Sequence, residues 1–299
     1  MTRNIKKFKN YKTAFSMVEI SIVILIIGLL IAGISKASDM IVDSKVKSAR
    51  SQTKASPVNR LPNLALWIET SSSESWPDRD RGGPTTTKTY SLKDINPQLT
   101  ANDLFIFPAV STIYKEDGYN SLPSINLSGD SKSSNSKSYT RVFDMEKGGG
   151  YSIFAVVKPV ASKKIIGFDE STPAASDGKG LTLEYDSTTK AKITFPSAAT
   201  ETSLVASSSS TIPNNAIEVI AVTSNKTKTA IFSNGTKTQS TTTQLTPDYN
   251  GFFTIYAGVE IFEIIVVGEW LSDPLRQRVE QYLFKKWNIP SDKLVAGTF

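Results

Sequence analysis

One uninterrupted apolar segment near the N-terminus constrains most strongly what this chain can fold into. Residues 15–34 read FSMVEISIVILIIGLLIAGI and carry a single charge, on Glu19. About twenty such residues in a helix cross the roughly 30 Å hydrocarbon core of a bilayer. The sequence therefore predicts a membrane-spanning helix.

The distribution of charge predicts how this helix is oriented. Residues 1–14 contain five basic side chains and no acid, and supply +5 of the formal net charge of +6. A basic flank stays on the cytoplasmic side, so we expect a single-pass protein whose chain after Lys36 lies outside the cytoplasm. The remaining chain is nearly neutral and shows no basic stripe, so nucleic acid is not an expected partner.

Glu19 needs an explanation, because a charge inside a spanning helix costs on the order of 2.5–3.5 kcal/mol. The run AFSMVE, from Ala14 to Glu19, precedes the aliphatic stretch. It resembles the leader junction of type IV pilins and type II secretion pseudopilins. The resemblance implies that a prepilin peptidase cleaves between Ala14 and Phe15, that Phe15 is then methylated, and that Glu19 pairs with the new amine of a neighbouring subunit.

The same resemblance implies a location and partners. It indicates a bacterial inner-membrane protein that meets other pilin-like subunits through its N-terminal helix and assembles into a cell-surface or periplasmic filament. Two other interpretations stay open. Ser35–Lys36–Ala37 matches a signal peptidase site, whose use would release a secreted protein beginning at Ser38, and an uncut segment would be a plain membrane anchor.

The helical pattern continues past the membrane segment, since no Pro or Gly occurs between Gly33 and Pro57. A helix from Phe15 to about Gln52 would be roughly 57 Å long. We therefore divide the chain into a leader (1–14), a transmembrane and stalk helix (15–54), a linker (55–62) and a head (63–299).

The head has short apolar runs separated by Ser, Thr, Gly and Pro, a texture typical of antiparallel β-structure. Asn234–Gly235 is a strong hairpin-turn signal, and Asp177–Gly178 and Asn250–Gly251 are weaker ones. The expected strands lie near 151–158, 163–168, 181–186, 191–195, 217–223, 228–233, 236–240, 252–256 and 259–267. Asp273 is the expected cap of a final helix, with Pro274 in its first turn and an apolar face that includes Val279, Leu283 and Trp287. Lys285 and Lys286 suit the negative end of the dipole of this helix.

Several phrases in this order resemble the laminin-G-like, concanavalin A-like jelly-roll sandwich: LALWIET (64–70), GYNSLPSINLSG (118–129), YSIFAVVKP (151–159), IFSNGT (231–236) and the closing segment 262–289. The predicted fold is mainly β, with a long N-terminal α-helix, an antiparallel β-sandwich and a short C-terminal helix. Loops are expected between about residues 71 and 100.

The composition excludes much of enzyme chemistry, because the chain has no Cys and no His. The fold family includes glucanases, which carry three alternating acids on one strand. Glu184 and Asp186 fit two of these places, but Thr188 occupies the third, so we expect a solvated strand face and no enzyme. Glu260 and Glu263 are three residues apart, which in a regular strand puts them on opposite faces.

Metal and ligand sites have weaker signals. Calcium would need several oxygens, to which Asp78 with Asp80, or Asp169 with Glu170, could contribute, but neither set forms a loop motif and no cofactor is expected. Sugar rings stack on aromatic side chains. The candidate ligand-binding residues are Trp76, Tyr90, Tyr114 and Tyr119, whereas Trp67, Trp270 and Trp287 are expected in the core.

These observations favour a non-enzymatic, pilin-like subunit whose lectin-like head serves adhesion or binds a carbohydrate or another surface ligand. The size of the head favours a minor subunit, by analogy with the family. The alternative is a membrane-anchored carbohydrate-active enzyme or sugar-binding module of the same sandwich fold.

Overall fold

The structure is a computed structural model of the 299-residue chain. It describes residues 16–75, 92–99, 112–115, 117–127, 132–138, 150–169, 181–188, 190–196, 201–205, 216–225, 227–241 and 252–290. The chain divides into two compact units, Met1–Ser44 and Lys45–Phe299. Ala14, Phe15, Trp76, Tyr90 and the acids Asp78, Asp80 and Glu170 lie outside the described residues.

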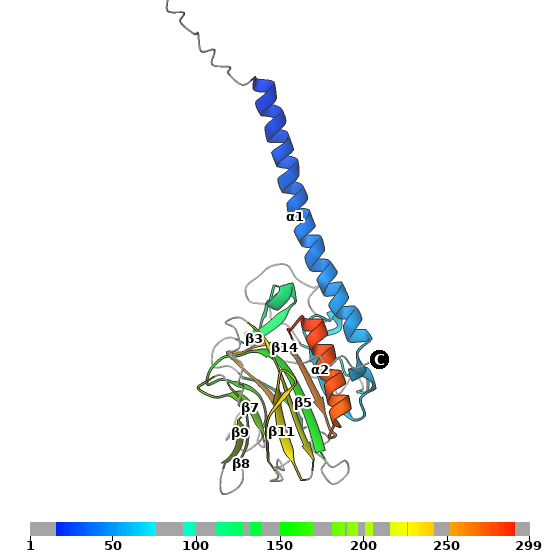
Figure 1. Ribbon diagram of the computed structural model, residues 1–299, viewed down its shortest axis with the longest axis vertical. Coiled ribbons are helices and arrows are strands. Elements are labelled where there is room, and N and C mark those ends of the chain that lie inside the picture. The colour runs from blue at the N-terminus through cyan, green and yellow to red at the C-terminus, as the bar shows by residue number, and fades with distance from the viewer. Residues whose placement is uncertain are drawn as a thin grey trace, which may run out of the picture. The chain divides into compact units, whose positions relative to one another are not determined.

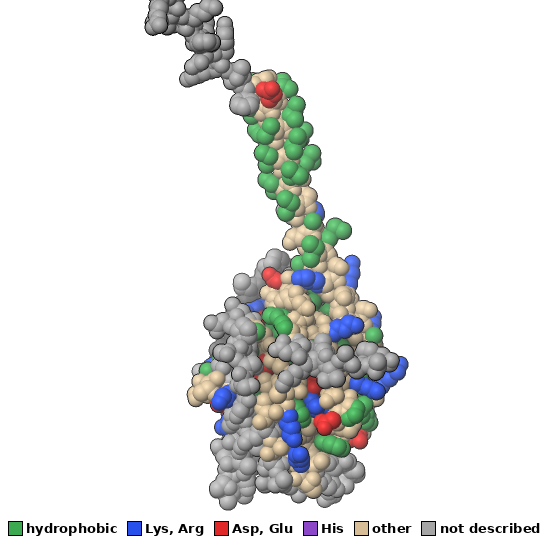
Figure 2. All heavy atoms as spheres, in the orientation of Figure 1, with side chains coloured by type: hydrophobic (Ala, Val, Ile, Leu, Met, Phe, Trp, Pro, Cys, Tyr) green, Lys and Arg blue, Asp and Glu red, His purple; other side chains and the backbone are tan. Residues whose placement is uncertain are grey.

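The N-terminal helix α1 runs from Met17 to Lys54 and confirms the predicted long helix. Its large hydrophobic side chains from Met17 to Ile41 are 49% to 88% exposed, and Figure 2 shows them covering the helix surface. One helix in the described part of the chain is long and apolar enough to cross a membrane, with a mean hydropathy of 2.8 in its most apolar window. A helix that is apolar all round suits a lipid environment.

The second unit contains two antiparallel sheets (Figure 1). The larger sheet has the order β12-β11-β10-β5-β14-β3-β2, and β1 also pairs with β14. Its strands are β1 (Leu64–Glu69), β2 (Thr112–Lys115), β3 (Ser124–Leu127), β5 (Gly150–Lys158), β10 (Glu218–Asn225), β11 (Thr229–Ser233), β12 (Thr236–Thr241) and β14 (Glu260–Val267). The fold class predicted from the sequence is confirmed.

The smaller sheet has the order β4-β13-β6-β7-β8-β9. Its strands are β4 (Lys132–Ser138), β6 (Lys164–Asp169), β7 (Thr182–Tyr185), β8 (Ala191–Pro196), β9 (Glu201–Val205) and β13 (Phe252–Tyr256). All nine strands expected from the apolar patterns are present. The strands without a matching expectation are β1, β2, β3, β4 and β9, of which β4 consists entirely of polar residues.

A buried apolar cluster fills the space between the two sheets. It includes Ile153 and Ala155 of β5, Leu183 of β7, Phe253 of β13 and Ile264 of β14, each fully buried. Phe168 and Phe253 pack with ring centroids 5.2 Å apart. Side chains alternate between the faces of a strand, so the intervening residues of β5 and β14 point to the other face of the larger sheet.

That outer face carries a second apolar cluster beneath the C-terminal helix α2 (Asp273–Trp287), which lies across the sheet beside β5 and β14 in Figure 1. Phe154 of β5 and Phe262 of β14 meet Leu283 and Trp287 of α2 in this cluster. The end of α1 adds Ala49, and the 3-10 helix η1 (Pro57–Arg60) adds Val58. The larger sheet is therefore buried on both faces along β5 and β14.

The structure tests two local sequence predictions, the Asn234–Gly235 hairpin turn and the N-terminus of α2. Asn234 and Gly235 have φ angles of 47° and 78° and join β11 to β12, so the predicted tight hairpin is confirmed. The N-cap of α2 is Ser272, one residue before the expected Asp273, and Pro274 lies in the first turn as predicted. The other two turn signals, Asp177–Gly178 and Asn250–Gly251, lie outside the described residues.

Candidate functional site

Glu19 lies in the first turn of α1 and is exposed. Its Oε2 accepts a hydrogen bond from the backbone N–H of Ser16 at 2.8 Å. This local bond places the carboxylate at the positive end of the helix dipole. The carboxylate is exposed on an otherwise apolar helix surface, where a neighbouring molecule can reach it.

The two tyrosines suggested as ligand-binding residues are described by the structure, and they do not meet. Tyr114 on β2 is partly buried and packs against the cluster between the sheets. Tyr119, in the 3-10 helix Tyr119–Ser121, is partly buried and packs against the cluster beneath α2. The structure therefore brings together no shared aromatic surface from this pair.

The carboxylates of the glucanase-like pattern have ordinary structural partners. Glu184 on β7 pairs with the Lys192 ammonium at 3.1 Å and accepts a hydrogen bond from the Thr194 hydroxyl at 3.0 Å. Asp186 follows β7 and caps a turn by accepting the backbone N–H groups of Thr188 and Lys190. Burial by itself would raise the pKa of Asp186, but the hydrogen bonds from Lys190 and Thr188 together hold it below its ordinary value. Both acids serve the β7–β8 connection.

A metal site can be sought only in the part of the chain that the structure describes, and there no group of three or more Asp or Glu residues is placed to hold an ion. Glu260 on β14 is engaged by the Lys115 ammonium at 3.1 Å and by the Ser124 hydroxyl at 2.6 Å. These bonds tie β14 to β2 and β3.

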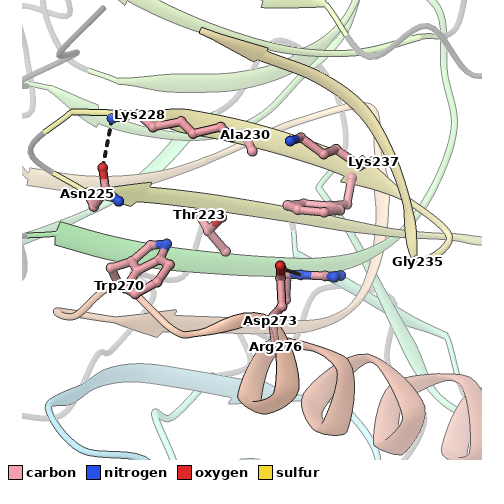
Figure 3. Close-up of a pocket in the computed structure, with 10 residues that line it drawn as sticks. Thr223, Asn225, Lys228, Ala230, Gly235, Lys237, Trp270, Asp273 and Arg276 are labelled. Carbon is pink, nitrogen blue, oxygen red and sulfur yellow. Dashed lines mark hydrogen bonds and ion pairs between the residues drawn. The ribbon is translucent and has the colours of Figure 1, made fainter. Parts of the chain in front are cut away.

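A hollow on the described part of the head lies on the outer face of the larger sheet, next to the N-terminal turn of α2. It has a volume of about 250 Å³. Figure 3 shows Trp270 and Asp273 along one side and Lys228 and Lys237 along the other, with Thr223 and Asn225 of β10 beneath. Strands β10, β11 and β12, the β14–α2 connection and the first turn of α2 thus meet around one opening.

Trp270 corrects an expectation from the sequence. It was expected in the core with Trp67 and Trp287, which are 1% and 0% exposed, but its own side chain is 43% exposed. The physical reason is its position: β14 ends at Val267 and α2 begins at Asp273, so Trp270 lies in the connection and escapes the alternation of the strand. The signal available was its setting among the polar residues of GEWLSD.

Of the basic side chains that line the hollow, one is buried and two are exposed. Arg276 is buried, lies 3.8 Å above the ring centroid of Phe232, and pairs with Asp273 at 3.3 Å and with Glu280. Lys228, directly before β11, and Lys237, on β12, are exposed and both line the hollow. The hydrogen bond and the charge of Lys228 lower the pKa of Lys237, while Asp273 opposes this shift and Arg276 adds to it. The exposed part of the site is therefore cationic.

A second polar group lies wholly inside the head. The Lys286 ammonium bonds Glu69 Oε1 and Glu263 Oε2, both at 2.8 Å, and all three side chains are 0% exposed. The indole N–H groups of Trp67 and Trp287 donate to Glu263 at 2.8 and 2.9 Å, and the Tyr282 hydroxyl donates to it at 2.8 Å. Burial raises the pKa of Glu263, and the nearby Lys286 opposes that shift.

This buried network was not expected from the sequence. Lys286 was expected to suit the negative end of the helix dipole, but its side chain points inward onto Glu69 of β1 and Glu263 of β14. Regular alternation also fails around Glu263, because the β14–β5 register shifts between Ile261 and Glu263. This bulge lets Phe262 and Glu263 both reach Trp287. The bonds of this buried network join α2 to β1 and β14.

Comparisons with known proteins give limited information. No family model and no curated protein matches the chain. Among solved structures, it is similar to the binding domain of Paraclostridial mosquitocidal protein 1 (14% identity, TM-score 0.48), the binding domain of botulinum neurotoxin DC in complex with rat synaptotagmin II (12%, 0.49) and Trypanosoma rangeli sialidase (10%, 0.47). These matches cover 75%, 76% and 75% of this chain and 52%, 52% and 33% of the other chains.

The chain thus spans about half the length of the first two of these structures. At this level of similarity the function has to be argued from the residues of this chain. They point to two separate surfaces: an apolar helix with one carboxylate, and a cationic hollow beside an exposed tryptophan.

Proposed function

We propose that the chain is a prepilin-like, non-enzymatic membrane subunit that assembles through its N-terminal helix and displays the β-sandwich head as a binding module. The observation that carries this proposal is the surface of α1. Its residues from Met17 to Ile34 are apolar on every side and exposed, apart from Glu19 and Ser21, among those with a described side chain. A lone carboxylate in lipid requires a partner charge.

The partner follows from the proposed processing. Cleavage between Ala14 and Phe15 creates an amine four residues before Glu19. In an assembly the carboxylate of one subunit meets the amine of the next. Neutralising the charge then favours assembly in the membrane. A prepilin peptidase and other pilin-like subunits are the partners that this function requires.

Mass spectrometry of the N-terminal peptide from the native membrane fraction tests the processing step. We expect a chain that begins at methylated Phe15. A chain that begins at Ser38 would instead identify a secreted head and overturn the proposal, and an intact leader would identify a plain anchor.

The assembly step is tested by Glu19→Ala, which we expect to abolish recovery of the protein in sheared filaments while leaving it in the membrane. Asp39→Asn is the matched control, because it also removes one exposed carboxylate of α1 but lies beyond the apolar run. Equal loss of assembly in both variants would show that Glu19 has no specific role.

A further inference from the structure

The hollow beside α2 has the features of a binding site. It lies on the outer face of the larger sheet, next to the part of that face that α2 covers. The outer face of the larger sheet is packed by α2 and by the end of α1 along β5 and β14. At β10, β11 and β12 the same face opens into the hollow, which is lined by polar groups and one indole (Figure 3). Its volume of about 250 Å³ lies just below the roughly 300–1,000 Å³ typical of small-molecule sites. This space suits one or two monosaccharide units.

We propose that the hollow binds a sugar unit that carries a carboxylate, with the sugar ring stacked on Trp270 and the carboxylate held by Lys228 and Lys237. The inference rests on the proposed function in one respect, that the head is a binding module. It does not depend on Glu19 or on processing of the leader.

Trp270 supplies a stacking surface that is held in place. A Cβ added to Gly150, the first residue of β5, would lie 2.7 Å from Trp270 Cβ and would collide with the Ser224 carbonyl oxygen, so the connection runs directly against the sheet. The backbone N–H of Leu271 donates to the Ser152 hydroxyl at 3.0 Å and fixes the next residue. A rigid, half-exposed indole gives a ligand ring a large contact area at a small cost in conformational entropy.

The lysine pair supplies the preference for an anion. Lys228 and Lys237 lie close enough for one to depress the pKa of the other. A carboxylate between the two ammonium groups replaces this repulsion with two charge-assisted hydrogen bonds. Arg276 is already paired with Asp273 and Glu280, so the exposed lysines are the cations that remain for a ligand.

The other polar groups suit hydroxyls. Asn225 Oδ1 already accepts the backbone N–H groups of Thr227 and Lys228, at 2.9 and 2.7 Å, which leaves its amide nitrogen as the donor it can offer. Thr223 contributes a hydroxyl, and the 77%-exposed carboxylate of Asp273 can accept. Donors and acceptors around one aromatic face match a polyhydroxylated ring.

A nucleic-acid strand fits the same surface less well. Strand binding needs a basic groove that follows several phosphates and several aromatic platforms for successive bases. Among the lining residues Trp270 is the one exposed aromatic side chain, and Asp273 places a negative charge where a second phosphate would lie. We therefore favour the acidic sugar.

Isothermal titration calorimetry on the full chain in detergent micelles tests the proposal with two acidic probes, tri-galacturonate and 3′-sialyllactose. Each has a neutral counterpart, the methyl-esterified trisaccharide and lactose. We expect at least one acidic probe to bind, at least about tenfold more tightly than its counterpart, with an affinity that falls as salt rises.

Variants assign the binding to the hollow. Trp270→Ala is expected to weaken binding by about tenfold or more, and Lys237→Gln by roughly three- to tenfold. Lys285→Gln is the matched control, because this lysine is exposed and does not line the hollow. Because Trp270 and Lys237 are both exposed, we expect both variants to fold. Unfolding curves in urea check this for each variant.

Three results would overturn the proposal: neither acidic probe binds, the neutral counterparts bind equally well, or Trp270→Ala and Lys237→Gln bind like the unchanged protein. Tighter binding of an oligothymidylate than of both sugars would also overturn it, in favour of nucleic acid. None of these outcomes bears on the N-terminal processing, so failure of the sugar site and failure of the pilin-like assembly remain distinguishable.

Discussion

Replacing Lys286 with Met tests whether the buried network holds α2 onto the sandwich. The variant keeps an unbranched apolar stem but removes the ammonium group that bonds Glu69 and Glu263, both at 2.8 Å. Two carboxylates would then share a fully buried site without a cation. The indole and hydroxyl donors to Glu263 would remain.

The magnitude follows from the cost of an uncompensated buried charge. Removing one partner of a buried ion pair destabilises a protein by about 3–5 kcal/mol. The cost also depends on pH. Burial already raises the pKa of Glu263, and removing Lys286, which lowers it, raises it further. The folded variant therefore binds more protons than the unfolded chain, so its stability falls as pH rises above about 4.5, by up to about 1.4 kcal/mol per pH unit for each proton.

Urea unfolding of the full chain in detergent, followed by tryptophan fluorescence, measures both effects. We expect a loss of about 3–5 kcal/mol at pH 7 and a smaller loss at pH 5. Lys285→Met is the control, because this neighbouring lysine is exposed and its replacement should change stability by less than about 0.5 kcal/mol.

The reasoning would be refuted by a loss below about 1 kcal/mol in Lys286→Met, or by a loss that is the same at pH 5 and pH 8. Adding Glu263→Gln to the variant supplies a second check. Because it removes one of the unpaired carboxylates, the double variant should be more stable than Lys286→Met alone at pH 8.

Two further predictions concern the head. Burial raises the pKa of Asp94 to about 7, against hydrogen bonds from the backbone N–H groups of Trp67 and Asn96, so this residue costs the head roughly 4 kcal/mol of stability between pH 4 and pH 8. Asp94→Asn keeps the acceptor and should remove this fall, as measured by urea unfolding at both pH values; an unchanged pH dependence would contradict the assignment. Gly235→Ala places a side chain at φ 78°, which should cost about 1–2 kcal/mol, whereas Asn234→Gly should be nearly neutral in the same assay.

Local sequence patterns were sufficient to predict most of the helices and strands of the fold. The unbroken apolar run predicted α1, and the short apolar runs at 151–158 and 217–223 predicted β5 and β10 to within two residues. Asn234–Gly235 identified a turn because few residues accept two consecutive positive φ angles. In each case the signal and the structure it predicts lie within a few residues of each other.

The candidate site was not predictable in the same way, because it depends on which strands become neighbours. Lys228 directly precedes β11 and Lys237 lies on the neighbouring strand β12, but the position of Trp270 beside them follows from the pairing of β10 with β5 and of β5 with β14. The position of Trp270 in a patterned segment of the sequence had favoured a place in the core.

One part of the buried network, the inward position of Lys286, could have been inferred from helical spacing. Lys286 falls three and four residues after Leu283 and Tyr282, on the apolar stripe of α2 rather than beside it. A lysine on a buried stripe requires an acid opposite, and the bulge that turns Glu263 toward it can be recognised only in the assembled sheet.

The pairing of β1 with β14 has a consequence for the order in which the head can be completed. Trp67 lies opposite Ile265, so the first strand of the sandwich finds its partner almost two hundred residues later. Closing such a loop costs about 5 kcal/mol of chain entropy before any contact repays it. During synthesis, β1 cannot pair with β14 or pack against α2 until residues 260–287 have been made. Until then its apolar side chains have no partners in these two elements. The final helix α2 is made last, and the outer face of β5 and β14 is covered only when this helix packs against it.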